Sequence, residues 1–224
     1  MRGAALLRLL FPQRLCCHGC GQLLLQNEGL LCEDCGQALA RCTLLRREEE
    51  LLFKAEQLLT AAAFRYEGMA AELVHSLKYG ADRAAADALA AGMARRYALM
   101  PQLHAAQVCV AVPSYPRQAR RRGYAQAQVL CDAFTALTGL PSAAQTLSRV
   151  RYAKSQVGRN REERKQQIVG AFAADAAQTL PVRDRCVLLI DDVLTTGATA
   201  CECARVLYAC GARRVLALTA CAVR

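Results

Sequence analysis

Apolar and polar positions follow two different periods along this chain, and the alternation between the two predicts a fold. From about residue 62, short apolar runs suited to buried strands are separated by longer segments of helical periodicity. The runs that predict strands are 61–66, 107–112, 146–150, 186–191 and 213–223. The segments that predict helices are 69–80, 82–98, 123–139, 158–170 and 199–211. Buried strands separated by helices are typical of an α/β fold, here a parallel twisted sheet flanked by helices on both faces.

The first part of the chain follows a different pattern. Leucines recur at seven-residue steps through residues 43–59, and Glu50 precedes Lys54 by four positions, so this segment predicts an amphipathic helix. Cysteines are concentrated before it. We therefore expect a small cysteine-rich module over residues 1–45, a helical linker over 46–61 and a main domain over 62–224.

The composition is that of a globular protein without a membrane span. Hydrophobic residues make up 54% of the chain and charged residues 21%, and no run of about eighteen apolar residues occurs. Arg8 interrupts the apolar stretch near the start, and no small-residue cleavage site follows it, so we expect no signal peptide. These features predict a cytoplasmic location, where the 13 cysteines stay reduced and form no disulfide framework.

Two CxxCG motifs near the start have the spacing of metal ligands. Each pair lets two thiolates reach one ion from a tight turn, and we expect the glycine after each pair to permit that turn. Four cysteine ligands complete a closed tetrahedral zinc site, which stabilises a fold and leaves no open position for catalysis. Cys16 and His18 stay open as substitute ligands, and Cys42 as a bystander. The expected ligands are Cys17, Cys20, Cys32 and Cys35.

The net charge of +10 is unevenly distributed. Eleven of the 29 Lys and Arg residues fall within two short segments, 117–122 and 149–165, which suggests an anion held between them. Aromatic residues make up only 5% and Trp is absent, so a stacking surface for single-stranded nucleic acid has little support. We expect weak, non-specific and salt-sensitive DNA binding at most.

The stretch VLLIDDVLTTGATA at residues 187–200 carries the most specific pattern. An apolar strand runs into the acid pair Asp191 and Asp192, and then into a turn of threonine and glycine that opens a helix. In a parallel sheet, ligands bind beyond the carboxyl ends of the strands. Two adjacent carboxylates there suit ribose hydroxyls near a magnesium ion, and the N–H groups and hydroxyls of the turn suit a phosphate. The residues of this turn are Thr195, Thr196, Gly197, Ala198 and Thr199.

VLLIDDVLTTGAT resembles the phosphoribosyl pyrophosphate (PRPP) motif of type I phosphoribosyltransferases, and the wider chain resembles the ComF family. The resemblance covers both CxxCG pairs, FRYEGMAAELVHSLKYG, VAVPSYPRQARRRGYAQAQVL, the SQ of KSQVGRN, and GAF at 170–172. Ala125 and Gln167 stand where the family often has asparagine. The family implies a type I phosphoribosyltransferase-like fold behind a four-cysteine zinc module, and an association with DNA uptake during natural transformation (competence).

The resemblance also implies roles for individual residues. Thr195 to Thr199 would hold the 5-phosphate of PRPP, and the acid pair would hold its ribose hydroxyls. The loop with Pro113, Ser114 and Arg117 would meet the pyrophosphate. Residues 151–164 resemble a mobile loop that closes over the reacting centre, where basic donors and magnesium stabilise the leaving pyrophosphate. The catalytic residues would then be Asp191, Asp192, Lys154 and Arg159.

These patterns together predict a protein that binds PRPP with magnesium and transfers its phosphoribosyl group to an acceptor that the sequence does not identify. It would be a phosphoribosyltransferase, within the pentosyl-transferring class of glycosyltransferases. Two alternatives stay open: a PRPP sensor without turnover, and an adaptor for DNA-uptake proteins that uses the zinc module and the basic loops. No Walker A motif occurs, so hydrolysis of nucleoside triphosphates is not indicated.

Overall fold

A four-stranded parallel sheet forms the centre of the protein. The computed structural model describes residues 16–24, 29–44, 58–80, 82–150, 168–175 and 178–223. The strands lie in the order β1 (Leu59–Arg65), β6 (Arg214–Ala222), β5 (Cys186–Leu194) and β2 (Val108–Ala111). Each neighbouring pair is parallel. The predicted parallel sheet is therefore confirmed.

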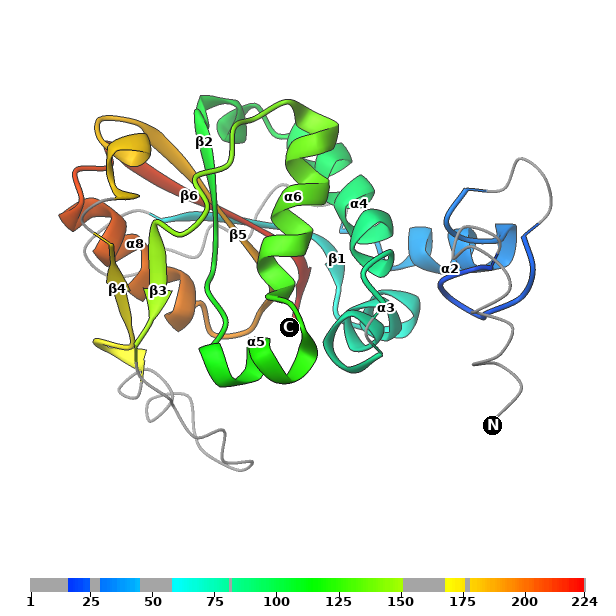
Figure 1. Ribbon diagram of the computed structural model, residues 1–224. Coiled ribbons are helices and arrows are strands. Elements are labelled where there is room, and N and C mark those ends of the chain that lie inside the picture. The colour runs from blue at the N-terminus through cyan, green and yellow to red at the C-terminus, as the bar shows by residue number, and fades with distance from the viewer. Residues whose placement is uncertain are drawn as a thin grey trace.

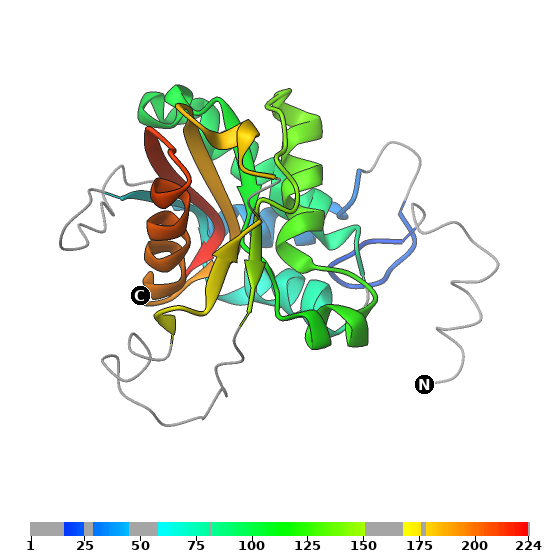
Figure 2. The ribbon, with the colours of Figure 1, turned by 60° about the vertical axis from the view of Figure 1, so that its left-hand side comes forward.

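Helices cover both faces of this sheet (Figures 1 and 2). One face carries α3 (Gly68–Tyr79), α4 (Ala85–Leu99) and α6 (Gln126–Thr138), and the other carries α8 (Ala198–Ala209). Shorter elements connect them: α5 (Pro116–Arg122) and the 3-10 helices η2 (Pro101–Ala105) and η4 (Leu180–Val182). The predicted α/β class, with helices on both sides of the sheet, is confirmed.

Side chains of the central strand β5 alternate between two cores. Leu188 and Ile190 pack in the cluster under α3, α4 and α6, whereas Val187 and Leu189 pack in the cluster under α8. Successive side chains of a strand point to opposite faces, and here both faces are covered. The same alternation directs Asp192 towards the α3 side and Asp191 towards the α8 side.

The chain changes direction between β2 and β5. After β2 and α6, Ser142 forms a parallel bridge to Cys109 on the outer side of β2. After β5 and α8, the chain turns instead towards β6, on the inner side. Two neighbouring parallel strands whose connections run in opposite directions leave a crevice beyond their carboxyl ends, where ligands of such sheets bind.

A small antiparallel pair lies against α8. It consists of β3 (Leu147–Arg149) and β4 (Phe172–Ala174). Phe172 is buried among residues of α8 and β2. The Gly170 N–H donates to Glu202 Oε1 on α8 at 2.8 Å, which fixes the approach to β4.

The cysteine-rich part packs onto the same core as the sheet. Its helix α2 (Glu33–Arg41) lies beside α3 (Figure 1). Leu39 and Cys42 belong to the hydrophobic cluster that contains Leu73 and Leu77 of α3. The Arg65 guanidinium at the end of β1 donates to the Arg41 carbonyl at 2.7 Å. These contacts make residues 29–44 part of one packed structure with the main fold.

The amphipathic helix predicted over 43–59 does not reach either end of that range. Thr43 forms an antiparallel bridge with Phe64, and β1 begins at Leu59, three residues before the expected start of the main domain. Backbone pairing with the sheet takes precedence over helical periodicity at both ends. Residues 45–57 lie outside the described residues, as does most of the helix expected over 158–170. The domain boundaries remain predictions.

Candidate functional site

The acid pair lies in β5 at the point where β2 has already ended. Asp191 still pairs with Thr219 of β6 on one side of β5. On the other side, the last link to β2 is the Val112 N–H, which donates to the Ile190 carbonyl at 2.9 Å. The acids therefore face the crevice at the carboxyl ends of β2 and β5, as the apolar run before them predicted.

A tight turn connects the acid pair to α8. Gly197 is the residue before the helix and has a φ of 74°, in the left-handed region that favours glycine. Thr196 Oγ1 accepts a hydrogen bond from the Ala198 N–H at 3.4 Å. The positive end of a 12-residue helix and threonine hydroxyls thus meet in one turn, an arrangement suited to an anion.

Lys78 at the end of α3 pairs with the acids. Its Nζ lies 3.0 Å from Asp192 Oδ2, and the side chains are 24% and 13% exposed. Burial opposes the charge of Lys78, but Asp192 and then Asp191 outweigh it and raise the lysine pKa. One lysine cannot neutralise two carboxylates, so the ionised pair keeps one negative charge.

Asp191 occupies the less favourable position of the two. Burial, and next the charge of Asp192, raise the pKa of Asp191 to about 8. The Asp192 N–H, which donates to Asp191 Oδ1 at 2.9 Å, offsets only part of this. Such a carboxyl ionises readily only when a ligand brings a cation or hydrogen-bond donors.

A polar pocket of about 270 Å³ opens at this crevice. Five predicted site residues line it: Pro113, Ser114, Asp191, Asp192 and Thr199. Thr195, Thr196, Gly197 and Ala198 lie in the adjoining turn at the start of α8. Arg117 is exposed in the first turn of α5 and is not among the described residues that line the pocket. Lys154 and Arg159 lie outside the described residues.

Five other polar side chains line this pocket. Arg122 and Arg149 belong to the two basic segments, 117–122 and 149–165, whose charge suggested an anion held between them, whereas sequence reasoning singled out none of the remaining three, Lys78, Tyr79 and Gln126. The five come from α3, α5, α6 and β3, and only the fold brings them together. One signal was available, since KYG and RRRGYAQ both belong to the segments that carry the family resemblance. Ala125 stands where the family often has asparagine. It is the cap residue before α6, and its methyl group cannot make the capping hydrogen bond that an asparagine side chain can make.

The four expected cysteines converge into one cluster. The sulfur atoms of Cys17, Cys20, Cys32 and Cys35 all lie within 4.8 Å of one another, and those of Cys20 and Cys32 are 3.8 Å apart. Ligands at a Zn–S distance of about 2.3 Å in a tetrahedron are about 3.8 Å apart, so the cluster fits such an ion with little movement. The prediction that these four residues are positioned to bind a metal ion is confirmed.

Backbone N–H groups prepare this cluster for negative charge. Burial opposes ionisation of Cys17, but N–H donors around it, including those of Gly19 and Cys32, lower its pKa to about 6. Burial, and next the neighbouring thiols, raise the pKa of Cys35. Four thiolates cannot coexist so closely without a cation, which is the condition that a bound metal satisfies.

The alternative ligands have other partners. His18 Nδ1 lies 3.1 Å from Asp82 Oδ2, with both side chains largely buried. The Cys42 thiol donates to the carbonyls of Ala38 and Glu67. Cys16 forms a β-bridge with Leu23 and is not part of the cluster.

The expectation for the two glycines holds only at the first pair. Gly21 has a φ of 78°, so the turn after Cys20 requires the left-handed region. Gly36 instead lies inside α2, outside the positive-φ region, and a Cβ there would meet nothing within 4 Å. The expectation was wrong at Gly36 because the second pair spans the start of a helix and not a second turn.

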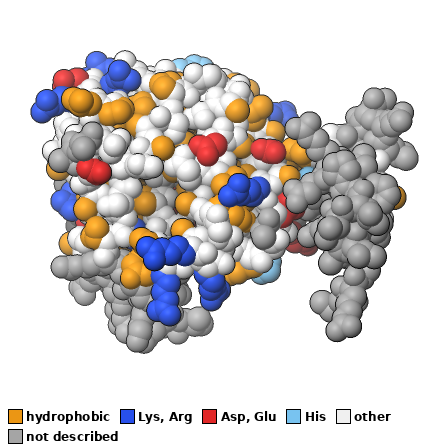
Figure 3. Space-filling view, viewed as in Figure 1, with side chains coloured by type: hydrophobic (Ala, Val, Ile, Leu, Met, Phe, Trp, Pro, Cys, Tyr) orange, Lys and Arg blue, Asp and Glu red, His pale blue; other side chains and the backbone are white. Residues whose placement is uncertain are grey.

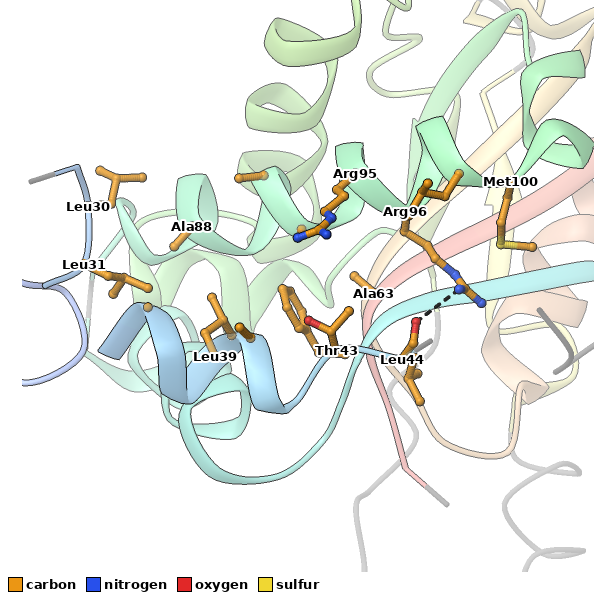
Figure 4. A pocket seen from close by; sticks show the side chains of 16 residues that line it. Leu30, Leu31, Leu39, Thr43, Leu44, Ala63, Ala88, Arg95, Arg96 and Met100 are labelled. Atoms are coloured by element: carbon orange, nitrogen blue, oxygen red, sulfur yellow. Dashed lines mark hydrogen bonds between the residues drawn. The ribbon is translucent and has the colours of Figure 1, made fainter. Parts of the chain in front are cut away.

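A second pocket, larger and mainly apolar, lies between α2 and α4 and has a volume of about 640 Å³ (Figure 4). Leu39 of α2 faces Ala88 of α4 across it, and the Arg96 guanidinium donates to the Leu44 carbonyl at 3.1 Å. No described acid lines it. A functional pocket is often the largest one, but here the smaller pocket is the better candidate for chemistry, because the acids line it.

No helix among the described residues is long and apolar enough to cross a membrane.

The arrangement defines a class of protein: a parallel α/β sheet with an acid pair and a threonine-glycine turn at its carboxyl edge, joined to a four-cysteine cluster. Comparison with known proteins gives relatives of this chain. It is 34% identical over 149 residues to DNA utilization protein YhgH of Salmonella typhi, covering 64% of this chain and 63% of that protein. It is 30% identical over 151 residues to the Escherichia coli K12 protein of the same name, with the same coverage.

A further relative is Competence protein F of Haemophilus influenzae Rd, 31% identical over 115 residues, covering 51% of this chain and 49% of that protein. The chain thus spans just under two thirds of the length of the first relatives. These homologues confirm the resemblance drawn from the motifs. No protein-family model matches the chain.

Similar solved structures include two enzymes. One is the glutamine PRPP amidotransferase from B. subtilis in complex with ADP and GMP, with a TM-score of 0.39 and 18% identity, covering 60% of this chain and 26% of that chain. The other is an allosteric regulatory enzyme of purine biosynthesis, with a TM-score of 0.38 and 18% identity, covering 60% and 25%. At these scores, the description of the fold rests on the topology of the sheet itself.

Proposed function

We propose that this protein binds PRPP with magnesium at the carboxyl edge of β2 and β5 and transfers its phosphoribosyl group to an acceptor. One observation carries the proposal. The acid pair, the loop after β2 and Thr199 in the first turn of α8 line a single polar pocket, and the turn before α8 adjoins it. Each of these parts has the chemistry of one part of PRPP. The relatives named for DNA utilization and competence suggest that the activity serves the handling of DNA.

Each part of the site has a distinct task in this proposal. The N–H groups of the first turn of α8 and the hydroxyls of Thr195, Thr196 and Thr199 hold the 5-phosphate. Asp191 and Asp192 accept hydrogen bonds from the ribose hydroxyls and orient the anomeric carbon. Ser114 and the N–H groups near it meet the pyrophosphate, and Lys154 and Arg159 would stabilise its charge as it leaves.

Magnesium fits the charges of the site. The ionised acid pair has Lys78 as its ion-pair partner among the described residues, and the charge of Arg149 also lowers the pKa of Asp191. A magnesium ion that arrives with PRPP would add positive charge where the diphosphate brings negative charge. Asp191 and Asp192 are the residues that would hold the ion together with PRPP. Bound there, it would supply positive charge to the leaving pyrophosphate.

Zinc is the metal that we assign to the four-cysteine cluster. Four sulfur ligands at this spacing are typical of a structural Zn²⁺ site, in which no coordination position is left for a substrate. The metal then stabilises the N-terminal module and takes no part in transfer.

Calorimetry with PRPP and magnesium tests the proposal. The double variant Asp191→Asn and Asp192→Asn keeps the side-chain volumes but removes the charge-assisted acceptors. It should bind PRPP about a hundredfold more weakly, since two such hydrogen bonds contribute about 3 kcal/mol. Asp132→Asn, on the exposed side of α6, is the matched control and should bind as the wild type does. Equal PRPP affinity in the double variant would contradict the proposal.

Turnover is a separate question and needs its own measurement. Wild-type protein incubated with PRPP, magnesium and a panel of nucleobases should release pyrophosphate with one member of the panel. Binding without release under all conditions would leave a PRPP sensor as the function.

A DNA adaptor is the runner-up, because exposed arginines gather on one helix. Arg117, Arg120 and Arg121 are exposed on α5, and basic side chains gather at the lower edge of the face in Figure 3, where α5 lies. Such a surface gives weak binding that falls steeply with salt. A salt-resistant, sequence-preferring complex with DNA would favour the adaptor over the enzyme.

A further inference from the structure

Gln126 is a buried side chain with one unsatisfied donor. It is 5% exposed at the start of α6 and lines the polar pocket. Its Oε1 accepts a hydrogen bond from the Arg122 guanidinium, whereas its Nε2 has no acceptor among the described residues. Rotating the amide would set its NH₂ group against the guanidinium, so the Arg122 contact fixes the orientation. An unused N–H donor therefore remains in the wall of the pocket.

Arg149 presents a second donor of this kind. It comes from β3 and lines the same pocket, and its Nε is buried without an acceptor among the described residues. Its guanidinium lies over the ring of Phe172, 5.3 Å from the ring centre. The contact uses the face of the guanidinium and leaves its N–H edge available.

Arg122 is held in a similar way. Its guanidinium lies 5.5 Å from the ring centre of Tyr79, which also lines the pocket. Gln126 occupies one of its N–H groups, and the guanidinium offers five in all. The ring and the amide together hold the cation in place before any ligand arrives.

These three side chains differ from Lys78, whose charge already pairs with Asp192 at 3.0 Å. Within the part of the chain that the structure describes, neither Arg122 nor Arg149 forms an ion pair. Buried donors without acceptors destabilise a fold, and natural proteins retain them where a ligand supplies the missing acceptors. The free donors of Gln126 and Arg149 lie in one pocket beside Arg122, which is already held in place. This arrangement is suited to a ligand with oxygen acceptors.

We propose that Arg122, Gln126 and Arg149 form a second anion subsite, distinct from the turn before α8. Its ligand is an oxygen-rich anionic group, a phosphate or a carboxylate, so the molecule bound across the pocket is anionic at two ends. The inference rests on the proposed function and deepens it. The second anion comes either from the diphosphate of the donor or from an acceptor that carries a carboxylate.

The test uses variants that change the donors and keep the surroundings. Gln126→Glu still accepts from Arg122 but replaces the free donor with a charged acceptor. Arg149→Lys keeps the charge over Phe172 but removes the planar N–H edge. Arg121→Gln is the matched control, because Arg121 is exposed on α5 beside Arg122 and does not line the pocket. Thermal unfolding of each variant establishes that it is folded.

Calorimetry with three probes then separates the parts of the site. Inorganic pyrophosphate represents the diphosphate, orotate represents a carboxylated acceptor, and ribose 5-phosphate reports on the acid pair and the turn. We expect Gln126→Glu and Arg149→Lys each to lower the affinity for pyrophosphate or for orotate at least tenfold. Ribose 5-phosphate affinity should change less than twofold, and Arg121→Gln should change none of the three.

The outcomes distinguish this inference from the proposed function. Weakened pyrophosphate binding identifies the diphosphate as the source of the second anion, and weakened orotate binding identifies the acceptor. If neither probe binds the wild type, or the variants bind both as the wild type does, the subsite is wrong. Ribose 5-phosphate binding that withstands the double Asn variant would instead contradict the role of the acid pair and leave the second subsite standing.

Discussion

Asp191 combines a role in ligand binding with an unfavourable position in the folded protein. Its carboxyl is half-buried beside Asp192, with Lys78 closer to the latter, and desolvation raises its pKa to about 8 from the ordinary value of 3.8. A carboxyl whose pKa is raised on folding destabilises the fold at high pH. The penalty is absent below about pH 4, grows as the pH rises towards about 8, and is then constant.

Asp191→Asn should therefore stabilise the protein at pH 8 and not at pH 4. We expect a gain on the order of 2 kcal/mol at pH 8, taking only part of the shift because a buried pair relaxes when it ionises. Urea unfolding at a series of pH values measures this. Asp132→Asn, an exposed aspartate, should leave the pH profile unchanged. A variant less stable than the wild type at pH 8 would show that Asp191 is ionised and well paired in the free protein.

At this scale, the sequence could predict only the part of the site that is contiguous. The acid pair and the turn lie within nine residues, so their order along the chain already gives their order in space. Gln126 could not be selected, and Arg149 could be selected only as one of several basic residues in the segment 149–165, because the significance of both lies in an absent acceptor. That property depends on packing from α5, β3 and β4 and has no sequence signature.

Strands and helices were predicted correctly where the apolar pattern of the sequence matches the burial of the element in the fold. The runs of β5 and β6 are apolar throughout because both faces of the sheet are covered, and they were found. Helix α5 was missed because PRQARRR carries no apolar stripe. Its signals were Pro116 at the first position and Gly123 after the end, with a φ of 82°.

Close packing of α4 on β1 depends on one glycine. A Cβ at Gly92 would overlap the ring of Phe64, which is 4% exposed. Gly92→Ala should destabilise the protein by about 1–3 kcal/mol through overpacking, although alanine favours a helix. The same substitution at Gly36 in α2, where a Cβ meets nothing within 4 Å, should stabilise by about 0.5–1 kcal/mol. Chemical denaturation compares the two, and a stabilising Gly92→Ala would mean that the Phe64 ring moves freely.

At the scale of the whole molecule, contacts around the four-cysteine cluster connect it to the main fold. His18 lies between two of its cysteines and pairs with Asp82, whose other oxygen accepts the Ala84 N–H at 3.1 Å before α4. Leu39 of α2 enters the core formed by α3 and α4. Metal binding and the stability of the main fold should therefore be coupled, because the two share one set of contacts.

Removing the metal should consequently lower the melting temperature of the entire chain, by about 5 °C or more for a protein of this size. Differential scanning calorimetry before and after chelation measures this, with metal analysis on the same samples. Cys32→Ser should lose the zinc and melt like the chelated wild type, whereas Cys210→Ser, at the far end of α8, should keep it. An unchanged transition after complete metal loss would mean that the cluster folds apart from the sheet. Full zinc content in Cys32→Ser would reject the ligand assignment itself.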